Sequence, residues 1–283
     1  MNSSQLFGYT TILYLVSAAF YIGLLVFRNK TVGLVGLILA GLGVLVHTGA
    51  LGLRWHESYQ IGIGHAPLTN MYESLVFFAW CTTLFYILLE IKFKVSVLGA
   101  LVMPMAVTTM AYTSLSSDIN RQISPLIPAL QSNWLIAHVI TCFIGYGAFA
   151  VAAGIGVVYL LKHFALKRNF SKDNLLSTLP ELPVLDDLTH KTIIFGFMWL
   201  TAGIITGAIW ANEAWGTYWS WDPKETWSII TWFIYAVLLH ARFTRGWNGT
   251  RIAWLAILGF LSVLFTYFGV NFILTGLHSY GAS

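Results

Sequence analysis

The sequence predicts an all-α polytopic membrane protein, a bundle of about eight transmembrane helices with both termini on the outer side. Three observations support this prediction. The 283 residues are 57% hydrophobic and only 9% charged, whereas about a quarter of the residues in a soluble domain are charged. Eight apolar stretches approach the length of about 20 residues that crosses a bilayer. The connections between these stretches alternate between strongly and weakly basic.

The apolar stretches follow one another without an intervening soluble module. Their approximate ends are 8–27, 32–53, 71–91, 95–113, 134–161, 191–211, 226–241 and 252–275. No repeat period is evident, so residues 1–283 are expected to form a single integral-membrane domain. Residues 1–5 lack the basic start of a cleavable signal, and the first stretch is therefore expected to remain as a helix. The charged connection 162–190 is expected to be a solvated tether with a short helix.

The basic residues are distributed unevenly between the two sides of the membrane. In this arrangement twelve of the fifteen Lys and Arg residues share one side, and only Arg54, Arg121 and Lys224 lie on the other. The positive-inside rule assigns the strongly basic side to the cytoplasm, so both termini face outward. The chain presents no basic face for nucleic acid, which is therefore not expected as a partner. It also lacks a C-x-x-C motif, which argues against a dithiol reductant and against a haem-attached cytochrome.

A tryptophan-rich segment, residues 210–227, lies between the sixth and seventh stretches on the outer side. It reads WANEAWGTYWSWDPKETW and holds five of the twelve tryptophans and three of the eleven acids. Indole rings settle where apolar material meets water. Asp222 followed by Pro223 and, three residues after Asp222, by Glu225 predicts a capping box at a helix start. The segment is interpreted as an aromatic shelf; the alternative is an aromatic belt that only anchors helix ends.

Two histidines flank this segment on the same predicted side. His138 lies about one turn into the fifth stretch, and His278 follows the eighth. Two facing imidazoles can occupy both axial positions of a haem iron, and an aromatic shelf suits a flat porphyrin. The alternative for either histidine alone is a hydrogen-bonded residue at a helix end. Zinc is less favoured because cysteine or carboxylate ligands at metal spacing are lacking, and hydrolase motifs are absent as well.

Two further histidines lie within apolar stretches, where an ionisable side chain is costly and marks a functional candidate. His240 is near the inner end of the seventh stretch, roughly 20 Å inward of Trp227 at 1.5 Å per residue. It is a candidate ligand for haem entering from the cytoplasm, or a residue that hydrogen-bonds a neighbouring helix. The second ligand of this inner haem iron is either His47 or a histidine of a partner chain. In the latter case His47 is a candidate waypoint on the path of the haem.

Two blocks of the sequence carry a resemblance to a known family. Trp215, Gly216, Trp219, Trp221, Asp222, Glu225 and Trp227 form the pattern W-G-x-x-W-x-W-D-x-x-E-x-W. This pattern resembles the tryptophan-rich signature of haem-handling proteins in cytochrome c biogenesis. Residues 65–74, HAPLTNMYES, resemble a second block of the CcsA (ResC-like) branch of that family. The histidines of the branch match His138, His278 and His240 here, and the resemblance covers most of the chain.

The resemblance implies a subunit of a System II cytochrome c synthase, or haem lyase. Such a protein would move haem b to the outer face of a bacterial inner membrane or a thylakoid membrane and present it for thioether attachment. The implied partners are apocytochrome c, a CcsB-like membrane protein and proteins of a thiol-reducing pathway. The implied iron ligands are His138, His278 and His240, and the signature residues Trp215, Trp219, Trp221, Asp222 and Trp227 are implied at the haem site. His47 is a further haem-site candidate because of its position in an apolar stretch. The alternatives are a haem exporter or delivery protein without synthase chemistry, and an assembly scaffold.

Overall fold

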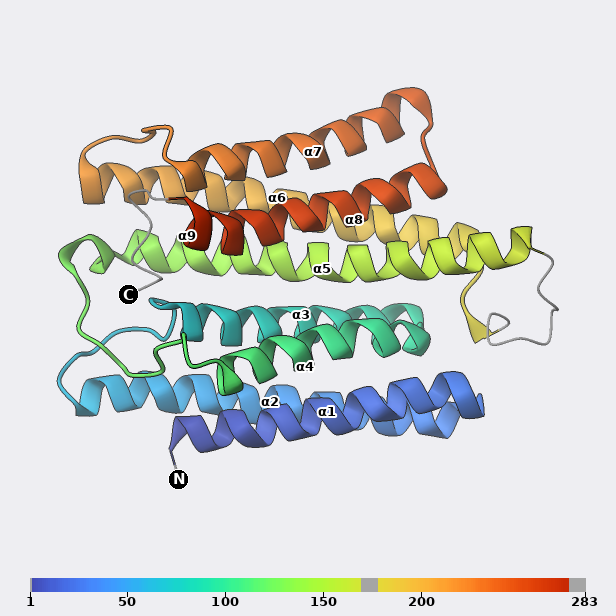
Figure 1. The fold of residues 1–283 in the computed structure, drawn as a ribbon, viewed down its shortest axis with the longest axis horizontal. Coiled ribbons are helices and arrows are strands. Elements are labelled where there is room, and N and C mark those ends of the chain that lie inside the picture. Colours follow the sequence, from blue (N-terminus) through green and yellow to red (C-terminus); the bar gives the residue numbers. More distant parts are fainter. Residues whose placement is uncertain (1, 169–177, 275–283) are drawn as a thin grey trace.

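The computed structural model describes residues 2–168 and 178–274, and every regular element in these ranges is helical (Figure 1). The long helices are α1 (Ser3–Phe27), α2 (Lys30–Gln60), α3 (Met71–Phe93), α4 (Gly99–Leu115), α5 (Asn133–Lys167), α6 (Leu182–Trp215), α7 (Pro223–Arg245) and α8 (Thr250–Leu264). A π-helical segment, Phe265–Gly269, joins α8 to the short α9 (Val270–Ile273). The predicted all-helical fold is confirmed.

Helix α5 runs through the middle of the bundle and packs against α3 on one side and against α6 and α8 on the other (Figure 1). Three of its glycines allow these close approaches. A Cβ atom on Gly145 or Gly147 would lie 3.0 Å from the backbone of α6 or α3, and one on Gly156 would lie 2.9 Å from the backbone of α8. Small residues at helix contacts are typical of membrane proteins, in which lipid competes with apolar side chains.

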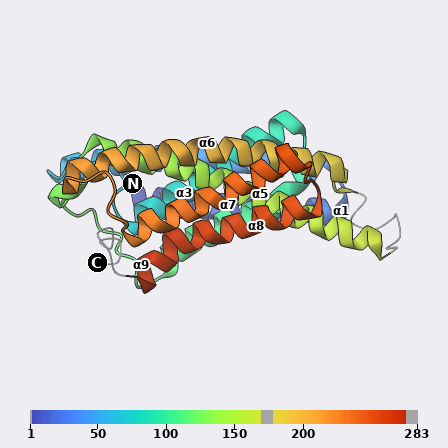
Figure 2. The same ribbon diagram turned by 90° about the horizontal axis from the view of Figure 1, so that it is seen from above.

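The remaining helices form two groups around α5. Helices α1 to α4 pack together on one side, where α1 contacts both α2 and α4. Helices α6, α7 and α8 lie on the other side, and Figure 2 shows α7 running between α6 and α8. The first and second halves of the chain therefore meet along α5.

Seven helices in the described ranges are long and apolar enough to cross a membrane, close to the predicted number of about eight. The last of them combines α8 with the segment to the end of α9. The predicted stretch 226–241 lies in α7, which is not among the seven. Its 23 residues span about 35 Å, so its length suffices. What distinguishes α7 is its polar content, because it contains Lys224, Glu225, His240 and Arg242.

The connections lie alternately at the two ends of the bundle (Figure 1). The start of α1 and the connections 61–70, 116–132 and 216–222 lie at one end, called here the shelf end. The short connections at residues 28–29, 94–98 and 246–249 lie at the opposite, basic end. Helices α5 and α6 also extend into the stretch expected to be a tether, whose residues 169–177 lie outside the described part.

Side chains cap two helices at the shelf end. Asn70 is the N-cap of α3, and its side chain accepts a hydrogen bond from the Glu73 N–H. Asp222 is the N-cap of α7, where it forms the predicted capping box with Glu225. A left-handed Gly216, with φ 77°, ends α6 and turns the chain toward this box.

Candidate functional site

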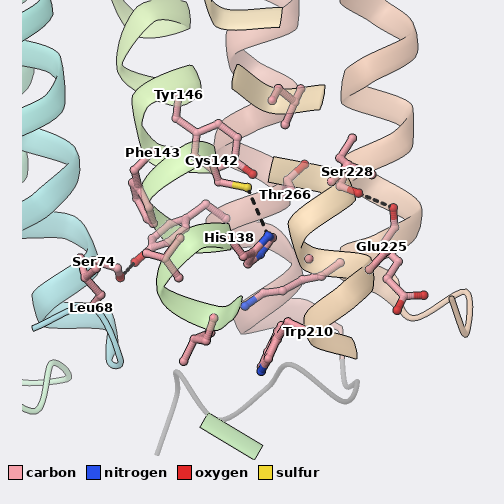
Figure 3. A pocket seen from close by; sticks show the side chains of 18 of the residues that line it. Leu68, Ser74, His138, Cys142, Phe143, Tyr146, Trp210, Glu225, Ser228 and Thr266 are labelled. Atoms are coloured by element: carbon pink, nitrogen blue, oxygen red, sulfur yellow. Dashed lines mark hydrogen bonds between the residues drawn. The ribbon is translucent and has the colours of Figure 1, made fainter. Parts of the chain in front are cut away.

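A cavity of about 190 Å³ lies at the shelf end of the bundle, and the two sequence blocks described above meet around it. One block contributes residues 68–71 and Ser74, and the other contributes Trp219, Lys224 and Glu225. Figure 3 shows Ser74 of α3 on one side, Glu225 and Ser228 of α7 on the other, and His138 of α5 between them. Segments about 150 residues apart in the sequence thus form one site.

The imidazole of His138 is held in one orientation. Its Nδ1 atom lies 2.8 Å from the carbonyl oxygen of Gly203 in α6. A carbonyl oxygen only accepts hydrogen bonds, so Nδ1 carries the proton and the lone pair is on Nε2. The ring also stacks on Trp210, with centroids 5.9 Å apart and an interplanar angle of 20°. A metal-binding histidine is commonly fixed in this way, because a hydrogen bond from one ring nitrogen orients the other toward the metal.

Glycines of α6 make the space that this imidazole occupies. A Cβ atom on Gly207 would lie 2.6 Å from the His138 Nδ1 atom, and one on Gly203 would lie 2.5 Å from Cys142 Sγ. Cys142 lies one turn after His138 on α5, and its Sγ atom is 3.7 Å from Nδ1 (Figure 3). The position of His138 and Cys142 therefore depends on glycine, which has no side chain, at positions 203 and 207 of α6.

The tryptophans of the shelf occupy different environments. Trp210 is buried, lines the cavity and donates a hydrogen bond from Nε1 to the Ala129 carbonyl oxygen at 2.8 Å. Trp219 also lines the cavity. Trp215 packs edge-on against Trp210 at 4.9 Å, and Trp221 lies edge-on to Trp219 at 5.7 Å. The cavity wall thus contains two of the five indoles, with Trp215 and Trp221 behind or beside them.

Trp221 and Trp227 do not line the cavity. Trp221 is 71% exposed and has φ 60°, in the left-handed region that is uncommon for a residue other than glycine. Such a conformation costs on the order of 1 kcal/mol and is found preferentially at functional sites. Trp227 packs against Phe265 of the π-helical segment, with centroids 4.1 Å apart. Trp221 is therefore exposed on the surface of the protein, and Trp227 links α7 to the π-helical segment after α8.

The charged residues of the segment have distinct roles. Asp222 and Glu225 bind backbone N–H groups: Asp222 accepts from Lys224 at 2.9 Å, and Glu225 accepts from Ser220 at 2.7 Å. The two carboxylates thus shape the turn into α7. Lys224 lines the cavity, and burial lowers the pKa of its ammonium group to about 8, against the opposing effect of the Asp222 carboxylate.

A buried ion pair holds the other sequence block in place. Arg54 Nε at the end of α2 lies 2.8 Å from Glu73 Oε1 in the first turn of α3, and both side chains are almost fully buried. Glu73 also accepts hydrogen bonds from the backbone N–H and the hydroxyl of Thr69. His65 is buried in the same block, with ring nitrogens 2.9 Å from the Ala66 carbonyl oxygen and 3.1 Å from that of Ser124. These contacts fix the cavity wall formed by residues 68–71.

His47 and His240 do not line this cavity. His47 is fully buried between α1 and α2, with Nδ1 3.1 Å from the Tyr14 hydroxyl oxygen, while its Nε2 atom has no hydrogen-bond partner in the described ranges. His240 is exposed on the surface of α7. Helices α2 and α7 lie at opposite edges of the bundle (Figure 1), so the structure does not bring His47 and His240 together. His278 lies outside the described residues.

Sequence reasoning missed several residues of the cavity. Cys142, Tyr146, Tyr267 and Asn271 all line it. The spacing of Cys142 four residues after His138 places both on one face of a helix and was a usable signal. The contribution of Tyr267 and Asn271 depends on the π-helical segment before them, which no sequence pattern identified.

Together these features define a class: an integral-membrane helical bundle with a cavity at one end lined by histidine and tryptophan. Residues 68–278 match the sequence model of the family described as cytochrome c assembly protein, and the chain belongs to this family. The resemblance identified from the sequence is therefore confirmed, and the chain is an integral-membrane protein of cytochrome c assembly, a family that implies haem handling.

Several relatives are similar over nearly the whole chain. The cytochrome c biogenesis protein CcsA of Guillardia theta is 43% identical over 288 residues, covering 96% of this chain and 93% of that protein. The corresponding protein of Gloeobacter violaceus is 38% identical, with 99% and 98% covered. The solved structure of the cytochrome c heme lyase CcmF matches with a TM-score of 0.68 at 18% identity. The match covers 94% of this chain but only 47% of CcmF, and shows a shared fold.

Proposed function

We propose that this protein binds haem b beside His138 and presents it for covalent attachment to apocytochrome c, as a subunit of a cytochrome c synthase. The observation that carries the proposal is the orientation of His138, whose Nδ1 atom donates to Gly203 while the ring lines a cavity walled by tryptophan. Haem is the cargo of this reaction. The residues fit it, because the lone pair is on Nε2 and the wall is aromatic.

His138 and His278 are the proposed axial ligands. Ligation by two histidines leaves no position open for oxygen. The Lys224 side chain lines the same cavity and supplies a positive charge for a haem propionate. Asp222 and Glu225 act through the backbone of the shelf, and Trp210 and Trp219 provide the aromatic surface.

The attachment chemistry needs no nucleophile from this chain. Each thiol of the apocytochrome's Cys-x-x-Cys-His segment adds across a vinyl group: a carbon–sulfur bond forms, the double bond becomes single, and the thiol proton ends on the other vinyl carbon. The histidine of the same segment then replaces one of the two axial ligands. The chain's own contribution is to hold the reactants in a productive orientation, which is the entropic part of catalysis.

The delivery route uses His240 as an inner ligand. Its exposure on α7 supports a second ligand from a partner chain, in the proposed complex a CcsB-like membrane protein, over the distant His47. The twelve-to-three split of basic residues supports an outward-facing shelf end. Reporter fusions after Ser283 or within residues 212–220 test this orientation. They should report the outer compartment and fusions after Gly246 the inner one; a cytoplasmic signal from Ser283 would reverse the assignment.

The competing function is a haem exporter or delivery protein that performs no attachment, and a third is an assembly scaffold. An absorption spectrum of the purified protein separates the scaffold from the other two, since only a haem-binding protein carries the bis-histidine spectrum. Co-expression with an apocytochrome then separates synthase from exporter, since a synthase alone yields haem that remains attached after denaturation. An apocytochrome with both cysteines replaced by serine is the matched control.

A further inference from the structure

One polar side chain of the cavity has a buried acceptor atom that no other described residue satisfies. Asn271 lies in α9, directly after the π-helical segment, and lines the cavity with His138 and Lys224. Its Oδ1 atom is shielded from solvent and has no hydrogen-bond partner among the described residues. A buried acceptor of this kind is costly unless a ligand or an ordered water satisfies it.

The neighbouring polar groups are already paired, which sets Asn271 apart. The Tyr267 hydroxyl lies 2.5 Å from Ser74 Oγ of α3. The Thr266 hydroxyl lies 2.8 Å from the Ser262 carbonyl oxygen and 3.1 Å from Thr231 Oγ1. These bonds anchor the π-helical segment to α3 and α7. A π-helical turn of this kind changes the direction of the residues that follow and is frequent at functional sites, and here the cavity-lining Asn271 follows it.

The chemistry of an amide indicates what Asn271 binds. An asparagine side chain offers one acceptor and two donors, so it can pair with the N–H and the C=O of a single peptide unit. Haem offers no matching donor, because its propionates only accept hydrogen bonds at neutral pH. A polypeptide main chain is therefore the better match for this side chain.

Resting on the proposed function, we propose that Asn271 binds the main chain of the apocytochrome's Cys-x-x-Cys-His segment. The amide pairs with one peptide unit of this segment, and haem lies beside His138 and Trp210. Asn271 is thus a positioning residue for the acceptor, which brings its thiols to the vinyl groups. Ser74 and Tyr267 support it by anchoring the π-helical segment that precedes it to α3.

The test measures peptide binding separately from haem binding. The full chain is purified in detergent with its haem, and a fluorescent peptide with Ser-x-x-Ser-His in place of the two cysteines is titrated against it. We expect Asn271→Leu to weaken peptide binding about tenfold and to leave the haem spectrum unchanged. Asn271→Asp, which keeps the shape and loses the donor, should give an intermediate loss and guards against misfolding of the leucine variant.

The neighbouring residue provides a matched control. Phe272 is 54% exposed and is not part of the cavity wall, so Phe272→Leu should bind the peptide as the parent does. Unchanged peptide binding in both Asn271 variants would overturn the inference, as would a parent protein that binds haem but not the peptide. A parent protein that binds no haem at all would instead refute the proposed function, so the two failures are distinguishable.

Discussion

The Nδ1 atom of His138 on α5 and the carbonyl oxygen of Gly203 on α6 are 2.8 Å apart. This hydrogen bond joins two helices and sets which imidazole nitrogen carries the lone pair. The bond also requires α6 to lie close to α5. This close approach is possible because Gly203 and Gly207 have no side chain. The site is therefore sensitive to changes in α6 that touch no charged or ligating group.

A methyl group at Gly207 should disturb the imidazole without unfolding the protein. In Gly207→Ala the new carbon would lie 2.6 Å from His138 Nδ1, and the side chain would have to turn away. We expect the haem content of the purified protein to fall about tenfold, the effect of losing roughly 1.4 kcal/mol of binding. Gly49→Ala on α2 is the control, because a methyl group there meets open space. Full haem content in Gly207→Ala would show that this contact does not position a ligand.

Removing the imidazole itself should be repairable from solution. We expect His138→Gly to lose the bis-histidine absorption spectrum and cytochrome c maturation, and added imidazole to restore both in part. Free imidazole can refill an axial position but cannot repair a misfolded bundle, so rescue identifies a ligand. His56→Gly is the control, since His56 is exposed at the shelf end and hydrogen-bonds only Gln60 in the described ranges. Normal maturation in His138→Ala would remove His138 from the site.

The sequence predicted the local features of this site better than their assembly. Asp222 and Glu225 identify a helix start because capping depends on residues three positions apart. The meeting of Ser74 with the tryptophan-rich segment depends on how α3 and α7 pack around α5, which no local pattern encodes. The exposure of His240 was unpredictable for another reason. Lipid is as apolar as a protein core, so the apolar residues of a membrane helix do not mark which face is buried. Phe233 and Val237 on the same helix are both more than half exposed.

The pKa of Lys224 predicts how haem affinity depends on pH. In the haem-free protein its pKa is about 8, so the ammonium is charged below that pH and neutral above it. A propionate gains from the charged form, so haem affinity should fall as pH rises above about 8, by up to about tenfold per pH unit. Lys224→Arg keeps its charge throughout this range and should bind independently of pH, whereas Lys224→Met should bind weakly at every pH. Equilibrium haem titrations at several pH values measure this; a parent-like pH profile in Lys224→Met would exclude the contact.

The last prediction separates delivery of haem from its final binding. His240 is exposed on α7 and is not among the residues that line the cavity beside His138. If haem passes through an inner site that includes His240 and a partner-chain ligand, His240→Ala should leave the outer site empty in cells. Haem added from outside to the purified variant should still bind with the bis-histidine spectrum, because the cavity is intact.

A second histidine near the basic end provides the control for this experiment. His163 of α5 stacks on Tyr159 at 6.1 Å, and its replacement by alanine should leave the haem content of cells unchanged. The lost imidazole lies on α7 in His240→Ala and on α5 in His163→Ala. Helix α7 begins at the shelf and runs to the basic end. Loss of externally added haem in His240→Ala would mean that the substitution damages the outer site itself. Parent-like haem content at the outer site of that variant would mean that haem reaches the shelf by a route without His240.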